Sequence, residues 1–152
     1  MRLRPANSTR PTILATLAAT LALAACAPRG YDPAKAAEPY PAAAHRAGSV
    51  DIQLFRDGPE ARIVNATVNS YRDVRLWLNQ RWVREIPDLP AGAIVEITLE
   101  EFRDLYGEQF VAGGFFRTER RTPIVLAQLE LTEDPDAELV GLRVISPSFE
   151  GR

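Results

Sequence analysis

Residues 74–83 read VRLWLNQRWV, and this stretch decides the class of fold. The apolar side chains at 74, 76 and 78 fall on one face of an extended chain, while Arg75 and Trp77 fall on the other. Asn79 and Gln80 then stand where a two-residue hairpin loop is expected, because Asn tolerates a positive φ. The chain returns as far as residue 86, so the stretch predicts a β-hairpin.

Further short apolar stretches separated by turn residues flank this hairpin on both sides. They predict strands at residues 50–55, 61–68, 93–99, 109–111, 115–118, 123–132 and 139–146. Seven to nine strands in about 100 residues, with turns every 8 to 12, are typical of small β-proteins. We therefore expect an all-β fold, a small antiparallel Ig-like β-sandwich. The hallmark Cys, Trp and Cys of antibody domains are absent, so the expectation concerns architecture alone.

Residues 98–107, TLEEFRDLYG, interrupt the strand pattern. Thr98 with Glu101 three positions later forms a capping-box pattern, and Gly107 suits the end of a helix. This segment predicts one short helix or helical turn that crosses between sheets.

The N-terminal region predicts export. Residues 1–10 carry three arginines and no acid, and residues 12–25 are an apolar run of 14. At ~1.5 Å per residue such a helix spans about 21 Å, less than the ~30 Å hydrocarbon core of a bilayer, so it predicts a signal peptide over residues 1–25 and no permanent span. Leu23, Ala24, Ala25 and Cys26 resemble the lipobox of bacterial lipoproteins.

That resemblance implies cleavage before Cys26 and attachment of acyl chains to it, since a thiol is the strongest side-chain nucleophile. The alternative is an ordinary secreted protein with an unmodified cysteine. Ala27, in place of Asp, resembles lipoproteins sorted to the outer membrane. We expect a lipid-anchored protein of the bacterial cell envelope, on the outer membrane and facing the periplasm.

Residues 26–48 are rich in Ala and Pro and lack apolar periodicity, which predicts a tether. The β-sandwich domain is expected over 49–148 and a short tail over 149–152. Cleavage before Cys26 would leave a chain with 15 basic and 20 acidic residues. Its net charge would be −5, and it has no basic tract. This composition argues against nucleic acid as a partner.

Few chemistry-bearing residues remain for catalysis or metal binding. The single cysteine excludes an internal disulfide, and the single histidine, His45, lies in the expected tether. The acids at 100, 101 and 104 suit the first turn of a helix better than an acid/base pair, and the acidic run 133–138 suits a β-turn better than a Ca²⁺ loop. We expect no enzyme activity, no cofactor and no metal.

Aromatic residues with a neighbouring arginine form the candidate binding surface. If the face of Trp77 is open, an exposed Trp beside Arg is a typical anchor for a partner; if another strand or a loop covers it, Trp77 is core. Phe115 lies after a double glycine, in an Arg-rich stretch where one of two adjacent phenylalanines is expected outside. The candidate binding residues are Tyr71, Arg75, Trp77, Trp82 and Phe115.

Two further partial resemblances concern the folded part. VNATVNSYRDVRLWL, residues 64–78, with LPAG at 89–92 is similar to bacterial FxLYD-type sandwich domains, and residues 74–99 are similar in spacing to PEGA domains, with Gln80 in place of the PEGA glycine. Both families imply non-catalytic modules. We expect a module for protein interaction or envelope assembly; the alternative is a module that binds an envelope glycan or a small molecule.

Overall fold

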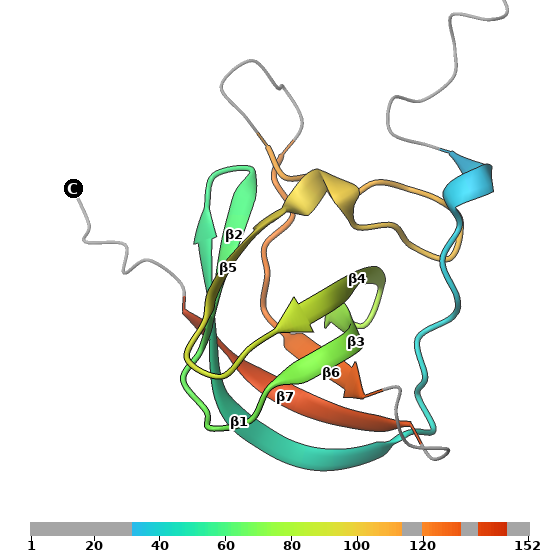
Figure 1. Ribbon diagram of the computed structural model, residues 1–152. Helices are drawn as coiled ribbons and strands as arrows, with labels where there is room; N and C mark the ends of the chain where they lie inside the picture. Colours follow the sequence, from blue (N-terminus) through green and yellow to red (C-terminus); the bar gives the residue numbers. More distant parts are fainter. Residues whose placement is uncertain (1–31, 114–119, 132–136, 146–152) are drawn as a thin grey trace, which may run out of the picture. The chain divides into compact units, whose positions relative to one another are not determined.

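The computed structural model describes residues 32–113, 120–131 and 137–145, and these form an all-β fold (Figure 1). The fold class expected from the sequence is confirmed. Besides two 3₁₀ turns, the described elements are seven strands: β1 (His45–Asp57), β2 (Glu60–Asn65), β3 (Tyr71–Leu78), β4 (Trp82–Leu89), β5 (Ile94–Thr98), β6 (Ala127–Leu131) and β7 (Glu138–Ile145). The 3₁₀ turns are η2 (Pro33–Lys35) and η3 (Leu99–Glu101).

The strands are hydrogen-bonded in the order β4-β3-β6-β7-β1-β2-β5. One pairing differs from the antiparallel expectation: β1 runs parallel to β7, while every other pair is antiparallel. The 13-residue β1 is long enough to pair with β7 on one side and with β2 on the other. A parallel pair needs a long connection, and here the other five strands lie between the two in sequence.

The predicted hairpin is present, with one adjustment to its loop. Leu78 pairs with Trp82, so the loop contains Asn79, Gln80 and Arg81 instead of two residues. Asn79 and Gln80 have φ angles of 52° and 57°, and the Arg81 N–H donates to the Leu78 carbonyl over 3.1 Å. The left-handed conformation that the sequence suggested for Asn79 extends to Gln80.

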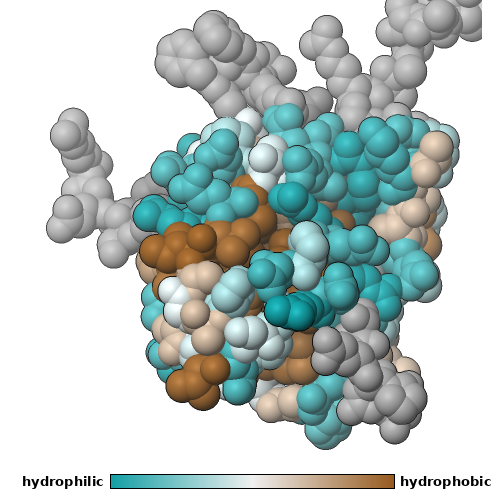
Figure 2. All heavy atoms as spheres, viewed as in Figure 1, coloured by the Kyte–Doolittle hydropathy of each residue, from teal (hydrophilic) through white to brown (hydrophobic). Residues whose placement is uncertain are grey.

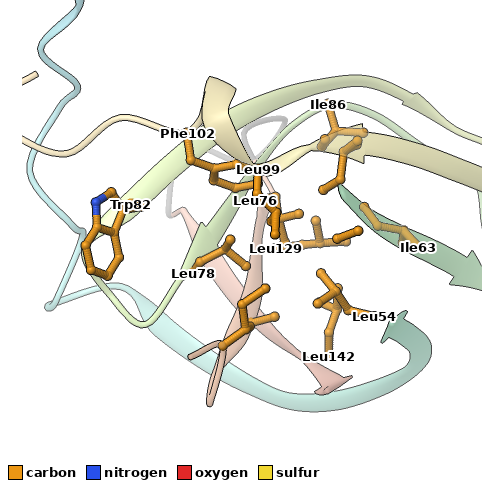
Figure 3. Packing of buried hydrophobic residues seen from close by; sticks show 14 of the residues in the cluster. Leu54, Ile63, Leu76, Leu78, Trp82, Ile86, Leu99, Phe102, Leu129 and Leu142 are labelled. Atoms are coloured by element: carbon orange, nitrogen blue, oxygen red, sulfur yellow. The ribbon is translucent and has the colours of Figure 1, made fainter. Parts of the chain in front are cut away.

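The core lies between the two halves of the folded-over sheet. Side chains from β1, β2 and β7 point toward those of β3, β4 and β6, as the labelled residues in Figure 3 show. The residues at 74, 76 and 78, predicted to share an apolar face, are at most 2 % exposed. Strand alternation therefore places one face of the hairpin in the core, as the sequence indicated.

The short helix or helical turn expected in residues 98–107 is present as the three-residue turn η3. Thr98 makes no side-chain capping hydrogen bond, and Phe102 already has extended angles of φ −69° and ψ 137°. Arg103 then exchanges backbone hydrogen bonds with Val83 of β4, at 2.9 and 3.1 Å. Pairing to the edge of the sheet thus ends the helix after one turn.

The folded domain begins earlier than the expected tether boundary at residue 49. Residues from Asp32 onward are described; η2 comes first, and β1 starts at His45. Between them, Ala37, Tyr40 and Ala44 pack on the outer side of the sheet, where the chain runs beside it in Figure 1. We call residues 37–44 the N-terminal strap.

The predicted signal peptide and C-terminal tail lie outside the described residues. Within the described part of the chain, no helix has both the length and the apolar character needed to cross a bilayer.

Candidate functional site

The outer face of β3 was the predicted place for an exposed aromatic anchor, and the N-terminal strap covers it. Trp77 is 1 % exposed and packs with Val83 and Leu139 against the strap. The Tyr40 ring meets the Trp77 ring edge-on, with centroids 5.3 Å apart and planes at 86°. Trp77 is therefore core, the second of the two alternatives that the sequence left open.

Polar contacts hold the strap and the β3 face together. Glu130, only 3 % exposed, accepts hydrogen bonds from Trp77 Nε1 at 2.7 Å and from Arg75 at 2.9 Å. Arg75 also pairs with Glu38 of the strap, and the Tyr40 hydroxyl donates to Gln128 Oε1 at 2.9 Å. Arg75 is thus a link within the domain, with both carboxylate partners supplied by the same chain.

The remaining predicted binding residues do not join Trp77 on one surface. Tyr71 is half-buried against the main core, and Trp82 is 9 % exposed and packs edge-on against Phe110 at 5.1 Å. Arg81 lies over the Trp82 ring, 4.6 Å from its centroid. Phe115 lies outside the described residues. The predicted binding residues therefore belong to two separate hydrophobic clusters: Trp77 to the cluster under the strap, and Tyr71 and Trp82 to the main core.

A shallow depression of about 650 Å³ lies on the outer side of β3 and β4. Its lining combines acids, arginines and one proline: Glu38, Asp73, Arg75, Arg84, Glu85 and Pro87. No aromatic ring belongs to this lining, whereas a glycan or small-molecule module was expected to have a concave pocket lined by aromatic residues. Among the described residues, no three His, Cys, Asp or Glu side chains are grouped to hold a metal ion.

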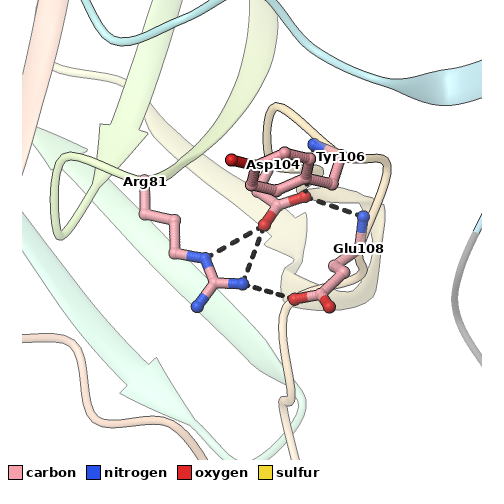
Figure 4. A network of polar contacts seen from close by, with 4 residues as sticks. All are labelled: Arg81, Asp104, Tyr106 and Glu108. Atoms are coloured by element: carbon pink, nitrogen blue, oxygen red, sulfur yellow. Dashed lines mark hydrogen bonds and ion pairs between the residues drawn. The ribbon is translucent and has the colours of Figure 1, made fainter. Parts of the chain in front are cut away.

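The most elaborate polar arrangement is the turn formed by residues 104–108, which we call the Asp104 turn (Figure 4). Asp104 is 1 % exposed, and one carboxylate oxygen accepts two hydrogen bonds from Arg81, at 2.8 and 3.0 Å. The other accepts the backbone N–H groups of Tyr106 and Glu108, at 2.9 and 2.8 Å. Arg81 also pairs with the Glu108 carboxylate.

Two opposing effects set the charge state of Asp104. Burial raises the pKa of this carboxyl, but the hydrogen bonds from Arg81, Glu108 and Tyr106 and the arginine charge outweigh it. The net result is a pKa below the ordinary value for Asp. Asp104 is ionised at neutral pH, and its negative charge holds the turn in one conformation.

The Asp104 turn presents two apolar side chains to solvent and joins the start of the domain. Leu105 is 46 % exposed and Tyr106 66 % exposed. Gly107 has a φ of +79°, and a Cβ there would lie 2.1 Å from the Asp32 carbonyl oxygen, so only glycine fits. The Asp32 N–H donates to the Gly107 carbonyl at 3.1 Å, and the Ala37 N–H to that of Asp104 at 2.9 Å.

The short helix or helical turn expected within residues 98–107 ends at η3, and the β-turn that follows it was not expected from the sequence. A competing signal was present. Asp at the first position of a four-residue turn and Gly at the fourth, as in Asp104 to Gly107, are typical of a type I β-turn.

The architecture defines this chain as a small β-sandwich with an N-terminal strap packed on its outer face. Comparison with known protein families, with curated proteins and with solved structures finds no match to this chain.

Proposed function

We propose that this chain is a lipid-anchored protein of the bacterial cell envelope, on the outer membrane and facing the periplasm, whose β-sandwich is a non-catalytic module for protein interaction. The observation that carries the proposal is the position of Cys26. It ends a lipobox-like sequence and stands only six residues before Asp32, where the described domain begins.

This spacing supports a module held near its anchor. A chain extends at most ~3.6 Å per residue, so six residues separate the Cys26 and Asp32 Cα atoms by at most about 22 Å. The tether expected over residues 26–48 would have reached ~65 Å if extended as polyproline II. An acylated Cys26 would therefore keep the domain close to the membrane surface.

The two strands at the ends of the sheet order offer a surface for a protein partner. β5 pairs with the single strand β2, while β4 pairs with β3 and, through Val83, with Arg103. β4 carries Pro87 and charged side chains, which discourage pairing with another chain. β5 is less protected, since Ile94 is 62 % exposed. Figure 2 shows hydrophobic residues gathered on the side where β2 and β5 lie in Figure 1, on an otherwise mostly hydrophilic face.

The environment of the two buried carboxylates supports a non-catalytic role. A glycosidase-type mechanism needs a pair of carboxyl groups facing each other across a cleft. Asp104 is engaged by Arg81, and Glu130 by Arg75 and Trp77, so both oxygens of each carboxylate already have partners within the domain. Neither residue lines the depression on β3 and β4.

Anchoring and interaction are tested together in cells that process lipoproteins. A clickable fatty acid should label the wild-type chain and not the Cys26→Ser variant. A photo-crosslinking amino acid at the exposed Glu96 of β5 should then capture a discrete envelope protein, while the same amino acid at the exposed Arg143 of the interior strand β7 should not. Equal labelling of Cys26→Ser removes the anchor, and equal capture from both positions removes β5 as the interaction edge.

A further inference from the structure

We propose that the Asp104 turn contacts the membrane interface beside the lipid anchor, with Leu105 and Tyr106 as the side chains that enter it. This inference rests on the proposed function, because it requires an acylated Cys26. It adds a second membrane contact, and therefore a defined orientation of the sandwich on the bilayer.

Exposure of the turn is the first observation. Leu105 and Tyr106 are consecutive, both are on the surface, and they are the two central residues of the β-turn from Asp104 to Gly107 within the Asp104 turn. Tyrosine, with an apolar ring and a polar hydroxyl, is enriched where membrane meets water, and leucine suits the hydrocarbon side of that boundary. A tip that projects two such side chains can insert without unfolding any strand.

Rigidity of the turn is the second observation. The buried Asp104 carboxylate binds two backbone N–H groups of its own turn and the Arg81 guanidinium. Exposed apolar side chains on a loop that folds freely would turn inward or pack together. The Asp104 network instead fixes them outward, and because the turn is already ordered, little conformational entropy is lost when it meets a surface.

Proximity to the anchor is the third observation. The Asp32 N–H donates directly to the Gly107 carbonyl, so the first described residue of the domain touches the turn. Cys26 therefore stays within about 22 Å of Asp32, the residue that contacts the turn. The exposed Leu105 and Tyr106 thus belong to a turn that is hydrogen-bonded to the residue from which the predicted anchor segment extends.

The charges around the tip indicate what kind of membrane contact this is. Lys35 pairs with Asp32, and Arg81 pairs with both Glu108 and the buried Asp104. These two cations and three carboxylates do not form a basic patch that would select anionic lipids. The contact should therefore depend on apolar insertion, and zwitterionic vesicles should support it at low and at high salt.

The test uses the full chain, purified with its acyl chains and reconstituted in phosphatidylcholine vesicles. Acylation blocks the thiol of Cys26, the only cysteine in the sequence, so a single introduced cysteine can carry an environment-sensitive fluorophore. Labels are compared at Tyr106→Cys and Val68→Cys. Val68 is 93 % exposed and lies before β3, whereas Arg81, which binds the Asp104 turn, lies after β3. β3 itself spans about 23 Å.

We expect the emission of the label at position 106 to shift to shorter wavelength. A lipid that carries a nitroxide on its headgroup should quench this label several-fold more strongly than the label at 68.

In a second set of variants the fluorophore is attached outside the tip. With the label on Lys35→Cys, replacing Leu105 and Tyr106 by serine should reduce quenching, while circular dichroism stays unchanged because both side chains are exposed.

Three results are decisive. Equal, water-like emission at 106 and 68 in vesicles that retain the acylated chain overturns the membrane contact and leaves the proposed function intact. A shift at 106 that needs added envelope protein, and is absent with lipid alone, also overturns it by making the turn a protein contact. A chain that carries no acyl group and does not stay with the vesicles overturns the proposed function itself.

Discussion

Replacing Tyr40 with alanine should cost the domain about 3 kcal/mol of unfolding free energy. The T-shaped ring pair with Trp77 accounts for about 1 kcal/mol of this. The hydrogen bond from the Tyr40 hydroxyl to Gln128 contributes about 1 kcal/mol, and burial of the half-covered ring contributes about 1 kcal/mol more.

Two variants separate these contributions. Tyr40→Phe keeps the ring and removes only the hydroxyl, so it should lose about 1 kcal/mol. Tyr106→Ala is the matched control, because it removes the same side chain from a position that is 66 % exposed; it should change stability by less than about 0.5 kcal/mol.

The assay is urea unfolding of the chain from Cys26 onward, followed by tryptophan fluorescence, with Cys26→Ser in every variant to keep the protein in solution. A loss of about 3 kcal/mol corresponds to roughly 10 °C in Tm for a domain of this size. Before unfolding, Tyr40→Ala should also show emission at longer wavelength, because Trp77 loses its cover. If Tyr40→Ala is as stable as Tyr106→Ala, the N-terminal strap is a tether, and the domain does not include it.

Three other perturbations test the turns. Asp104→Asn should lose about 2 kcal/mol at pH 7, since its neutral side chain pairs weakly with Arg81. Because the folded-state pKa of Asp104 is lowered, its contribution is present above the ordinary Asp pKa and disappears as pH falls through the lowered value. The stability difference from wild type, measured by urea unfolding, should therefore shrink below about pH 4, and a constant difference down to pH 2 would contradict the assignment. Gly107→Ala should cost about 2 to 4 kcal/mol, because its Cβ would overlap the Asp32 carbonyl at a positive φ; a thermal melt within about 1 °C of wild type would argue against this close approach. Gln80→Gly should raise the unfolding free energy by about 0.5 to 1 kcal/mol, since glycine is unstrained at a φ of 57°, and a loss of stability would indicate a different loop.

The parts of the fold that depend on local periodicity could be predicted from the sequence. Alternation at residues 74–78 identified the buried face of β3, and the Asn79 signal located the hairpin loop. The parallel pairing of β1 with β7 could not be read locally, because it joins segments separated by the other five strands. The short helix or helical turn expected within residues 98–107 is present as the single turn η3, and backbone pairing of Arg103 with Val83 follows it.

The candidate site was harder to predict because it depends on contacts across the chain. Residues 37–44 lack periodicity and read as a tether, yet Tyr40 packs on Trp77, a surface that exists only after β3, β6 and β7 have assembled. The same contact buries the tryptophan that the sequence left open as an anchor. In the sequence Asp104 is one of several neighbouring acids. Its ion pair could not be predicted from local sequence, because its partner Arg81 is 23 residues away.

Lipid attachment at Cys26 can be measured as the mass of the N-terminal tryptic peptide from protein extracted with detergent from envelopes. Cleavage after Arg29 would release Cys-Ala-Pro-Arg, residues 26–29. We expect this peptide to begin at Cys26 and to carry a diacylglyceryl group on sulfur, with or without a third acyl chain on its amine. A peptide with an unmodified Cys26 thiol, or one that begins at another residue, would contradict it.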